Sequence, residues 1–187
     1  ISDHYHPWVD AQGSSPFVWS VIGGIAEATG SLRLATGVTC PLIRIHPAII
    51  AQAAATAACL MPGRFTLGIG TGENLNEHIL GDAWPAADVR LEMFEEAIEV
   101  MRLLWEGGEQ THRGKHYTVD HARVYNLPDE PLQLAIAAGA PNAAEMAAKQ
   151  LMRRCMALLG SVAQSRLRRA HILTDEEWGR ISDAAGR

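Results

Sequence analysis

Short apolar runs that end in glycine alternate along this chain with longer amphipathic segments. The runs 32–38, 65–70 and 132–139 are short and glycine-terminated, which is typical of buried strands. Residues 1–4 resemble the end of a further strand, so strand ends fall near positions 3, 37 and 71, about 34 residues apart. One strand, one helix and two loops need about this length, so the spacing predicts repeated βα units. A helical-hairpin repeat of the same period is the alternative.

The segments between these runs predict helices. Segments 16–29 and 47–61 each begin with proline and are followed closely by glycine, the usual punctuation of a helix. Segment 85–105 predicts one long amphipathic helix, which Gly107-Gly108 ends. Residues 109–128 are rich in turn residues and predict a hairpin-like excursion with a solvated polar surface. The pattern therefore predicts an α/β fold.

Composition narrows the class of protein. The chain has 187 residues, of which 48% are hydrophobic, as in ordinary globular proteins. No apolar run approaches the ~20 residues of a membrane span, and no secretory signal is visible. The three cysteines are widely spaced, which argues against a disulfide framework or a cysteine zinc site and for a reducing cytoplasm.

Charge divides the chain into two parts. Residues 1–148 carry 8 basic and 17 acidic side chains, a net charge of −9, whereas residues 149–187 carry 8 basic and 4 acidic, a net of +4. The basic residues of this tail lie among Leu, Met and Ala without aromatic partners, so nucleic-acid binding is not predicted. We expect a domain over 1–148 and a helical basic tail of unclear origin over 149–187.

The glycine-rich strand end at 65–76 is the first candidate ligand site. Thr71, Glu73 and Asn76 follow the strand where α/β folds bind ligands, at the carboxyl ends of parallel strands. The glycines at alternate positions would let backbone or ligand approach closely. A dinucleotide fingerprint is excluded, because the third glycine of G-x-G-x-x-G would fall on Glu73.

Asp3 and His4, at the end of the first strand, are the second candidate. If the strands are neighbours, Glu73 overlooks His4, and the two can divide proton-donating and proton-accepting roles. The rest of the pocket would be open and flat, which suits a planar ligand. Its walls would be Gly37, Gly72, Ala138 and Gly139.

Two other chemistries fit less well. His4-x-His6 could begin a metal site, but the later strand ends supply only Glu73 as a further ligand, so no metal is predicted. Cys40 would need a neighbouring base and a lowered pKa to act as a nucleophile. His46 and His78 are expected to be structural.

Five segments match a known family in combination. They are Ser2-Asp3-His4-Tyr5-His6-Pro7-Trp8, Thr36-Gly37-Val38-Thr39-Cys40-Pro41, His46-Pro47-Ala48-Ile49-Ile50-Ala51-Gln52, Gly68-Ile69-Gly70-Thr71-Gly72-Glu73-Asn74-Leu75-Asn76-Glu77, and 90–98 with Leu104-Trp105. On these segments the chain resembles the coenzyme F420-dependent glucose-6-phosphate dehydrogenase group of the bacterial-luciferase-like (β/α)8 barrels. The likeness covers about residues 1–148 and implies a partial TIM barrel, roughly strands 2 to 5.

The resemblance implies roles for particular residues. His4 would accept the proton of a sugar hydroxyl as hydride leaves for the deazaflavin, Glu73 would donate a proton to the reduced ring, and Trp8 would shape the pocket. A non-proline cis peptide is expected at Gly37-Val38. The positions implied to hold the cofactor are Asp3, Gly37, Val38, Cys40, Thr71, Gly72, Asn76, Gly139 and Ala140.

The chain also departs from the family's pattern. Nothing beyond residue 148 matches the threonine and basic residues that bind the sugar phosphate, and glycine at 37 and cysteine at 40 replace the serine and threonine of some members. The substrate would be a sugar phosphate or a similar alcohol, and full-length relatives are expected to be homodimers. The alternatives are a non-catalytic N-terminal fragment and a monooxygenase dependent on flavin mononucleotide (FMN).

Overall fold

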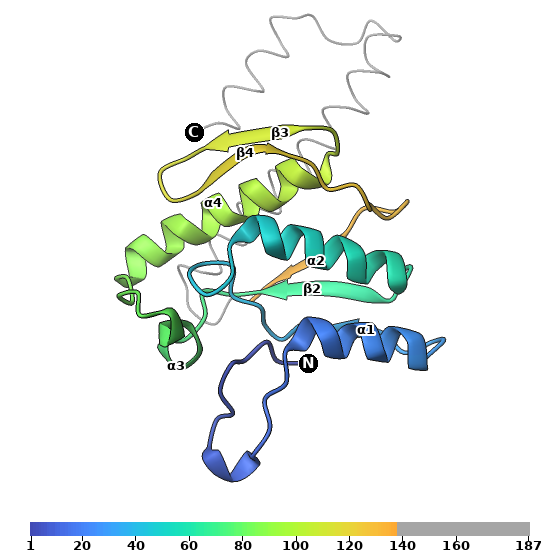
Figure 1. Cartoon of the computed structure of the whole chain (residues 1–187), viewed down its shortest axis with the longest axis horizontal. Helices are drawn as coiled ribbons and strands as arrows, with labels where there is room; N and C mark the ends of the chain where they lie inside the picture. Colours follow the sequence, from blue (N-terminus) through green and yellow to red (C-terminus); the bar gives the residue numbers. More distant parts are fainter. Residues whose placement is uncertain (138–187) are drawn as a thin grey trace, which may run out of the picture. The chain divides into compact units, whose positions relative to one another are not determined.

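The computed structural model describes residues 1–137, so Ala138, Gly139, Ala140 and the tail at 149–187 lie outside the described residues. A three-stranded parallel sheet forms the centre of this part (Figure 1). Its order is β1 (Leu34–Ala35), β2 (Phe65–Ile69), β5 (Gln133–Ile136). Leu34 pairs with Phe65, and Ile69 with Ile136. The prediction of parallel βα units is confirmed, and the helical-hairpin repeat is wrong.

The first residues of the chain lie beside β1. The amino group of Ile1 donates to the carbonyl of Ala35 at 2.8 Å, and the backbone nitrogen of Gly37 donates back to Ile1 at 2.7 Å. This alternation is the hydrogen-bond pattern of parallel strands. It brings Asp3 to the same edge of the sheet as the carboxyl ends of β1 and β2.

Three helices match the predicted segments to within two residues at each end. They are α1 (Val18–Ala28), α2 (Pro47–Leu60) and α4 (Ala87–Trp105). The ring of His46, as expected a structural residue, accepts a hydrogen bond from the backbone of Ala48 and caps α2. None of the helices in residues 1–137 is long and apolar enough to cross a membrane.

The alanine-rich helix α2 contacts β2 and the other two long helices (Figure 1). Ala51, Ala54 and Ala55 are fully buried, and their small side chains let neighbouring elements approach closely. The indole nitrogen of Trp105 donates to the carbonyl of Ala51 at 2.9 Å and ties α4 to α2. From α4, Phe94, Ile98 and Met101 complete the buried core.

The expected excursion after α4 is an antiparallel hairpin of β3 (Gln110–Arg113) and β4 (Thr118–Ala122). The carboxylate of Glu96, on α4, accepts hydrogen bonds from the backbone nitrogens of His116 and Tyr117 at 3.0 and 2.8 Å. His112 also contacts Glu96, at 3.1 Å. The expected solvated surface is therefore confirmed for the exposed Arg113, Lys115 and His121, whereas His112 and His116 pack half-buried against the helix.

Three short elements have no counterpart in the sequence pattern. They are η1 (Asp10–Gln12), α3 (Asn74–Glu77) and η2 (His78–Leu80). A helix of a single turn is too short to show hydrophobic periodicity, so tertiary contacts decide it.

Glycines along and after β2 make room for the segment that follows β1. A Cβ atom at Gly68 would collide with the carbonyl oxygen of Thr36, and one at Gly70 would lie 2.8 Å from Cγ2 of Val38. A Cβ at Gly72, where φ is +68°, would meet the sulfur of Cys40. Close approach of protein, rather than of a ligand, therefore explains why these three positions are glycine.

We expect Gly68→Ala to destabilise the fold by about 1–3 kcal/mol or more, because the added methyl group meets backbone that cannot move aside. Urea unfolding followed by circular dichroism measures this. Gly24→Ala, in α1, is the matched control: a Cβ there meets nothing within 4 Å, and alanine should add roughly 0.5–1 kcal/mol of stability. Equal stability of the Gly68→Ala protein and the unchanged one would contradict the close approach.

Candidate active site at the carboxyl edge of the sheet

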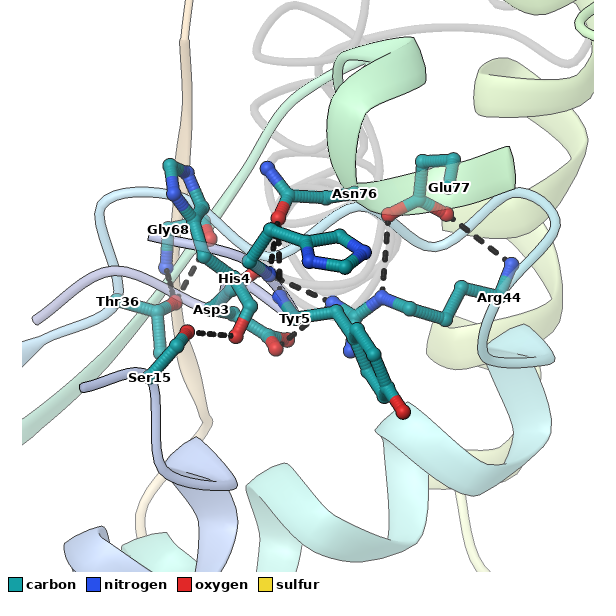
Figure 2. A network of polar contacts seen from close by, with 10 residues as sticks. Asp3, His4, Tyr5, Ser15, Thr36, Arg44, Gly68, Asn76 and Glu77 are labelled. Carbon is teal, nitrogen blue, oxygen red and sulfur yellow. Dashed lines mark hydrogen bonds and ion pairs between the residues drawn. The ribbon is translucent and has the colours of Figure 1, made fainter. Parts of the chain in front are cut away.

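Polar side chains from three separate segments meet at the carboxyl edge of the sheet (Figure 2). Asp3 and His4 come from the first segment, Arg44 from the segment between β1 and α2, and Asn76 and Glu77 from α3. Asp3, Asn76 and Glu77 are buried, with 3%, 3% and 1% of their surfaces exposed. Because buried polar groups are costly unless they are paired, their partners define the site.

Arg44 lies between two carboxylates. Its Nη2 atom donates to Oδ1 of Asp3 at 2.8 Å and to the carbonyl oxygen of Asp3 at 3.0 Å. Its Nε donates to Oε1 of Glu77 at 3.3 Å, and its backbone nitrogen donates to Oε2 at 3.0 Å. Burial disfavours the charged guanidinium, but the hydrogen bonds and charges of the two carboxylates outweigh burial and raise the pKa of Arg44.

Neither Arg44 nor Glu77 was singled out from the sequence. Glu77 ends one of the segments that match the family, and Arg44 is the single charged residue in an apolar stretch from 40 to 45. That isolation is the signal that could have found Arg44, because a lone arginine among apolar residues is expected to be buried beside an acidic partner.

Asn76 fixes the backbone around His4. Its Oδ1 atom accepts hydrogen bonds from the backbone nitrogens of Tyr5 and His6 at 2.9 and 3.0 Å. The hydroxyl of Ser15 donates to the carbonyl of His4 at 2.8 Å (Figure 2). Asn76 was expected to hold the cofactor. The structure commits its oxygen to the protein, while its amide nitrogen has no hydrogen-bond partner within residues 1–137.

Two ring pairs surround the His4 segment. The rings of His4 and Trp8 meet edge to face, with centroids 4.9 Å apart and planes at 71°. His6 stacks on His78 with centroids 5.8 Å apart and planes at 13°. Trp8 is 57% exposed, so its ring contact with His4 lies at the surface of the protein. His78 thus contacts the segment that carries His4 and does not interact within its own helix alone.

Glu73 lies at the start of α3 as its N-cap residue, and its side chain is exposed. No hydrogen bond or ion pair joins Glu73 to His4 in the part of the chain that the structure describes. Glu77, one turn further along, reaches the first segment through Arg44 instead. The pairing of Glu73 with His4 therefore stays a prediction.

The turn after β1 contains the expected non-proline cis peptide between Gly37 and Val38. A Cβ atom at Gly37 would meet nothing within 4 Å, so space is open above this turn. Cys40 is buried, and burial together with the nearby carboxylate of Glu77 raises the pKa of its thiol. Cys40 is thus a poor nucleophile. Thr71, next to Gly72 on the loop after β2, is half-buried.

The site suits a bound organic cofactor that offers hydrogen-bond donors. Oδ2 of Asp3 is buried and has no hydrogen-bond partner within residues 1–137, whereas Oδ1 is paired with Arg44. Two carboxylates share one guanidinium, so the group carries an excess negative charge when all three are ionised. A ligand N–H or O–H donor at Oδ2 would satisfy this atom.

Parallel strands with polar loops at their carboxyl ends define this chain as part of an α/β barrel with its site at the barrel top. The model of the luciferase-like monooxygenase family matches residues 1–173, and the chain belongs to this family. The domain boundary expected at 148 stays a prediction.

The relatives of this chain include several F420-dependent enzymes. It is 41% identical over 149 residues to the F420-dependent glucose-6-phosphate dehydrogenase of Beutenbergia cavernae, covering 80% of this chain and 44% of that protein. It is 40% identical over 148 residues to the F420-dependent hydroxymycolic acid dehydrogenase of Mycobacterium tuberculosis, covering 79% and 41%. The chain therefore spans less than half the length of these relatives.

Solved structures of F420-dependent enzymes also resemble this chain. An F420-dependent secondary alcohol dehydrogenase, in complex with an F420-acetone adduct, matches with a TM-score of 0.75 and 38% identity, over 78% of this chain and 44% of that one. The coenzyme F420-dependent tetrahydromethanopterin reductase of Methanopyrus kandleri matches with a TM-score of 0.66 and 23% identity, over 80% and 44%. The second likeness shows the shared fold alone.

We expect the two described cysteines to differ sharply in reactivity. In a Cys155→Ser background, iodoacetamide should modify the exposed Cys59 readily and leave Cys40 unmodified until the chain unfolds, because Cys40 is buried and its raised pKa suppresses the thiolate. Mass spectrometry of native and urea-treated protein measures this. Comparable labelling of both cysteines under native conditions would contradict the burial of Cys40.

Proposed function

We propose that this chain forms the cofactor-binding part of an F420-dependent oxidoreductase, which transfers hydride between a small-molecule alcohol and a deazaflavin. The observation that carries the proposal is the buried Oδ2 of Asp3, which has no hydrogen-bond partner within residues 1–137. Sequence identity of 38–41% to enzymes named for F420 supports this cofactor. The relatives named for FMN are near 20% identity, so their likeness supports only the fold.

The proposed cofactor site follows the strand ends. Asp3 would accept a hydrogen bond through Oδ2, and the amide nitrogen of Asn76 would donate one. Gly37 and Val38 would lie under the ring, with Thr71 and Gly72 beside it and Cys40 packed behind Gly72. Gly139 and Ala140 keep their proposed role but lie outside the described residues. A bound deazaflavin supplies a carbon that accepts or releases hydride.

The protein's own part of the chemistry is to place and move protons. His4 would take the proton of the substrate hydroxyl, since Ser15 holds its carbonyl and Asn76 holds the backbone nitrogens that follow it. Trp8 would keep solvent from the His4 ring and shape the substrate pocket. Glu73 would be the second acid, at the exposed start of α3.

We propose that the substrate is an alcohol and that the reaction takes place at its hydroxyl-bearing carbon. The relatives are named for glucose 6-phosphate, hydroxymycolic acid and a secondary alcohol, and the hydroxyl-bearing carbon is what these substrates share. A sugar phosphate is the narrower proposal.

Titration of the purified chain tests the cofactor directly. We expect oxidised deazaflavin to bind, with quenching of its fluorescence, and FMN to bind at least about tenfold more weakly. Asp3→Asn should weaken deazaflavin binding, because an amide cannot replace the carboxylate at both Arg44 and the ligand. Tighter binding of FMN would favour the monooxygenase, and no binding of either would favour the non-catalytic fragment.

His4→Ala and Glu73→Ala should lower turnover by about 10²–10⁴-fold in a complete family member that carries this site, while cofactor affinity changes little. Steady-state reduction of deazaflavin with an alcohol substrate measures turnover, and fluorescence titration measures affinity. Equal losses of binding and turnover would contradict the proton-transfer roles.

Two further expectations concern the setting of the protein. The two described cysteines, Cys40 and Cys59, are unpaired, which agrees with a reducing cytoplasm.

We also propose a homodimer that forms through α1 and α2. Helix α2 has no charged residue and α1 only Glu27. Between them lies an apolar hollow of ≈ 280 Å³, bordered by the exposed Phe17, Ile49 and Leu60. Exposed apolar surface of this kind favours association.

Ile49→Asp should convert a dimer into a monomer in sedimentation velocity, because it places a charge in the hollow between α1 and α2. Tyr125→Asp is the matched control, since Tyr125 is 79% exposed, lies after the hairpin and is not among the residues that line the hollow. A dimer that survives Ile49→Asp but not Tyr125→Asp would place the interface elsewhere.

A further inference from the structure

We infer that Arg44 is a positioning residue for the cofactor: it sets which oxygen of Asp3 is offered to the ligand and joins α3 to the segment that carries His4. This inference rests on the proposed function, because it assigns Asp3 to the cofactor. Arg44 itself contacts neither substrate nor cofactor in this role and acts through its two carboxylate partners.

The contacts on the Asp3 side determine its orientation. A single nitrogen of Arg44, Nη2, donates to both the side chain and the main-chain carbonyl of Asp3, at 2.8 and 3.0 Å. Rotation of the carboxylate would break the first bond while the second still holds the backbone. Oδ1 is therefore committed, and Oδ2 remains buried with no partner in the described part of the chain.

The contacts on the other side reach α3. Glu77 accepts from Nε of Arg44 and from its backbone nitrogen, so both of its oxygens are engaged. The adjacent residue, Asn76, accepts from the backbone of Tyr5 and His6. One turn of α3 thus attaches to the chain on both sides of His4, directly through Asn76 and through Arg44 at Asp3 (Figure 2).

Lysine could not replace Arg44 in this geometry. The guanidinium is planar and donates in two directions from different nitrogens, whereas an ammonium group is a single point with three donors. The side chains of Arg44, Asp3 and Glu77 are 6%, 1% and 1% exposed, so water cannot replace a lost contact. Lysine would keep the charge but lose one of the two connections.

Arg64 provides a matched control with a structural role only. Its Nη1 atom donates to the carbonyls of Thr29 and Leu32 at 3.0 and 3.2 Å. It comes directly before β2, at the amino end of the strand, whereas Arg44 works at the carboxyl end. Arg64→Lys removes guanidinium hydrogen bonds to main-chain carbonyls without touching Asp3 or α3.

The experiment compares Arg44→Lys and Arg64→Lys in the 187-residue chain. We expect Arg44→Lys to raise the dissociation constant of oxidised deazaflavin about tenfold, and Arg64→Lys to change it less than about twofold, although both lower the melting temperature. In an Asp3→Asn background, Arg44→Lys should weaken binding by less than it does in the unchanged chain, because part of the effect of Arg44 passes through Asp3.

Amide hydrogen exchange without cofactor supplies a second readout. Arg44→Lys should speed exchange at Tyr5 and His6, whose N–H groups depend on α3, and Arg64→Lys should not. Unchanged affinity and unchanged exchange in Arg44→Lys would overturn the inference, as would fully additive losses with Asp3→Asn. If the unchanged chain binds no deazaflavin, the proposed function fails, and the exchange data alone then decide whether Arg44 positions this segment.

Discussion

The pairing of one buried arginine with two carboxylates organises the edge of the sheet where the site lies. Asp3 and Glu77 belong to segments more than seventy residues apart, and Arg44 gives them their shared partner. Each of these groups would be costly to bury alone, because an unpaired charge loses its hydration without compensation. The three groups therefore require one another, and with them the first segment, the loop before α2 and the short helix α3 are fixed together.

The close approach of β1 and β2 makes this arrangement possible. Glycine at 68 allows β2 to lie against the carbonyl of Thr36. Glycine at 72, in the loop after β2, leaves room for the side chain of Cys40. The loops that carry Asp3, Gly37 and Asn76 consequently leave the sheet close to one another. A ligand at this edge meets a surface of backbone and small side chains, which suits a planar ring better than a compact polar molecule.

The fold and the site together account for the chemistry proposed for the family. Hydride transfer belongs to the cofactor, so the protein has to bind the ring, exclude water and hold proton donors and acceptors. The described residues supply a buried carboxylate oxygen at Asp3, an imidazole at His4 with a fixed backbone, and an indole at Trp8 in edge-to-face contact with that imidazole. Relatives that act on different alcohols are consistent with a common cofactor half and variable substrate contacts elsewhere.

The strands and the long helices could be predicted from hydrophobic periodicity and from proline and glycine punctuation, because both are local signals. The residue pattern also indicated Asp3, His4 and the loop at 71–76, and the family resemblance predicted the cis peptide at Gly37-Val38. The folded structure was needed to show that the glycines of β2 serve the packing of protein, that Asn76 holds the backbone beside His4, and that Arg44 joins Asp3 to Glu77. Such contacts join residues distant in the chain, and no periodic pattern records which buried charge meets which.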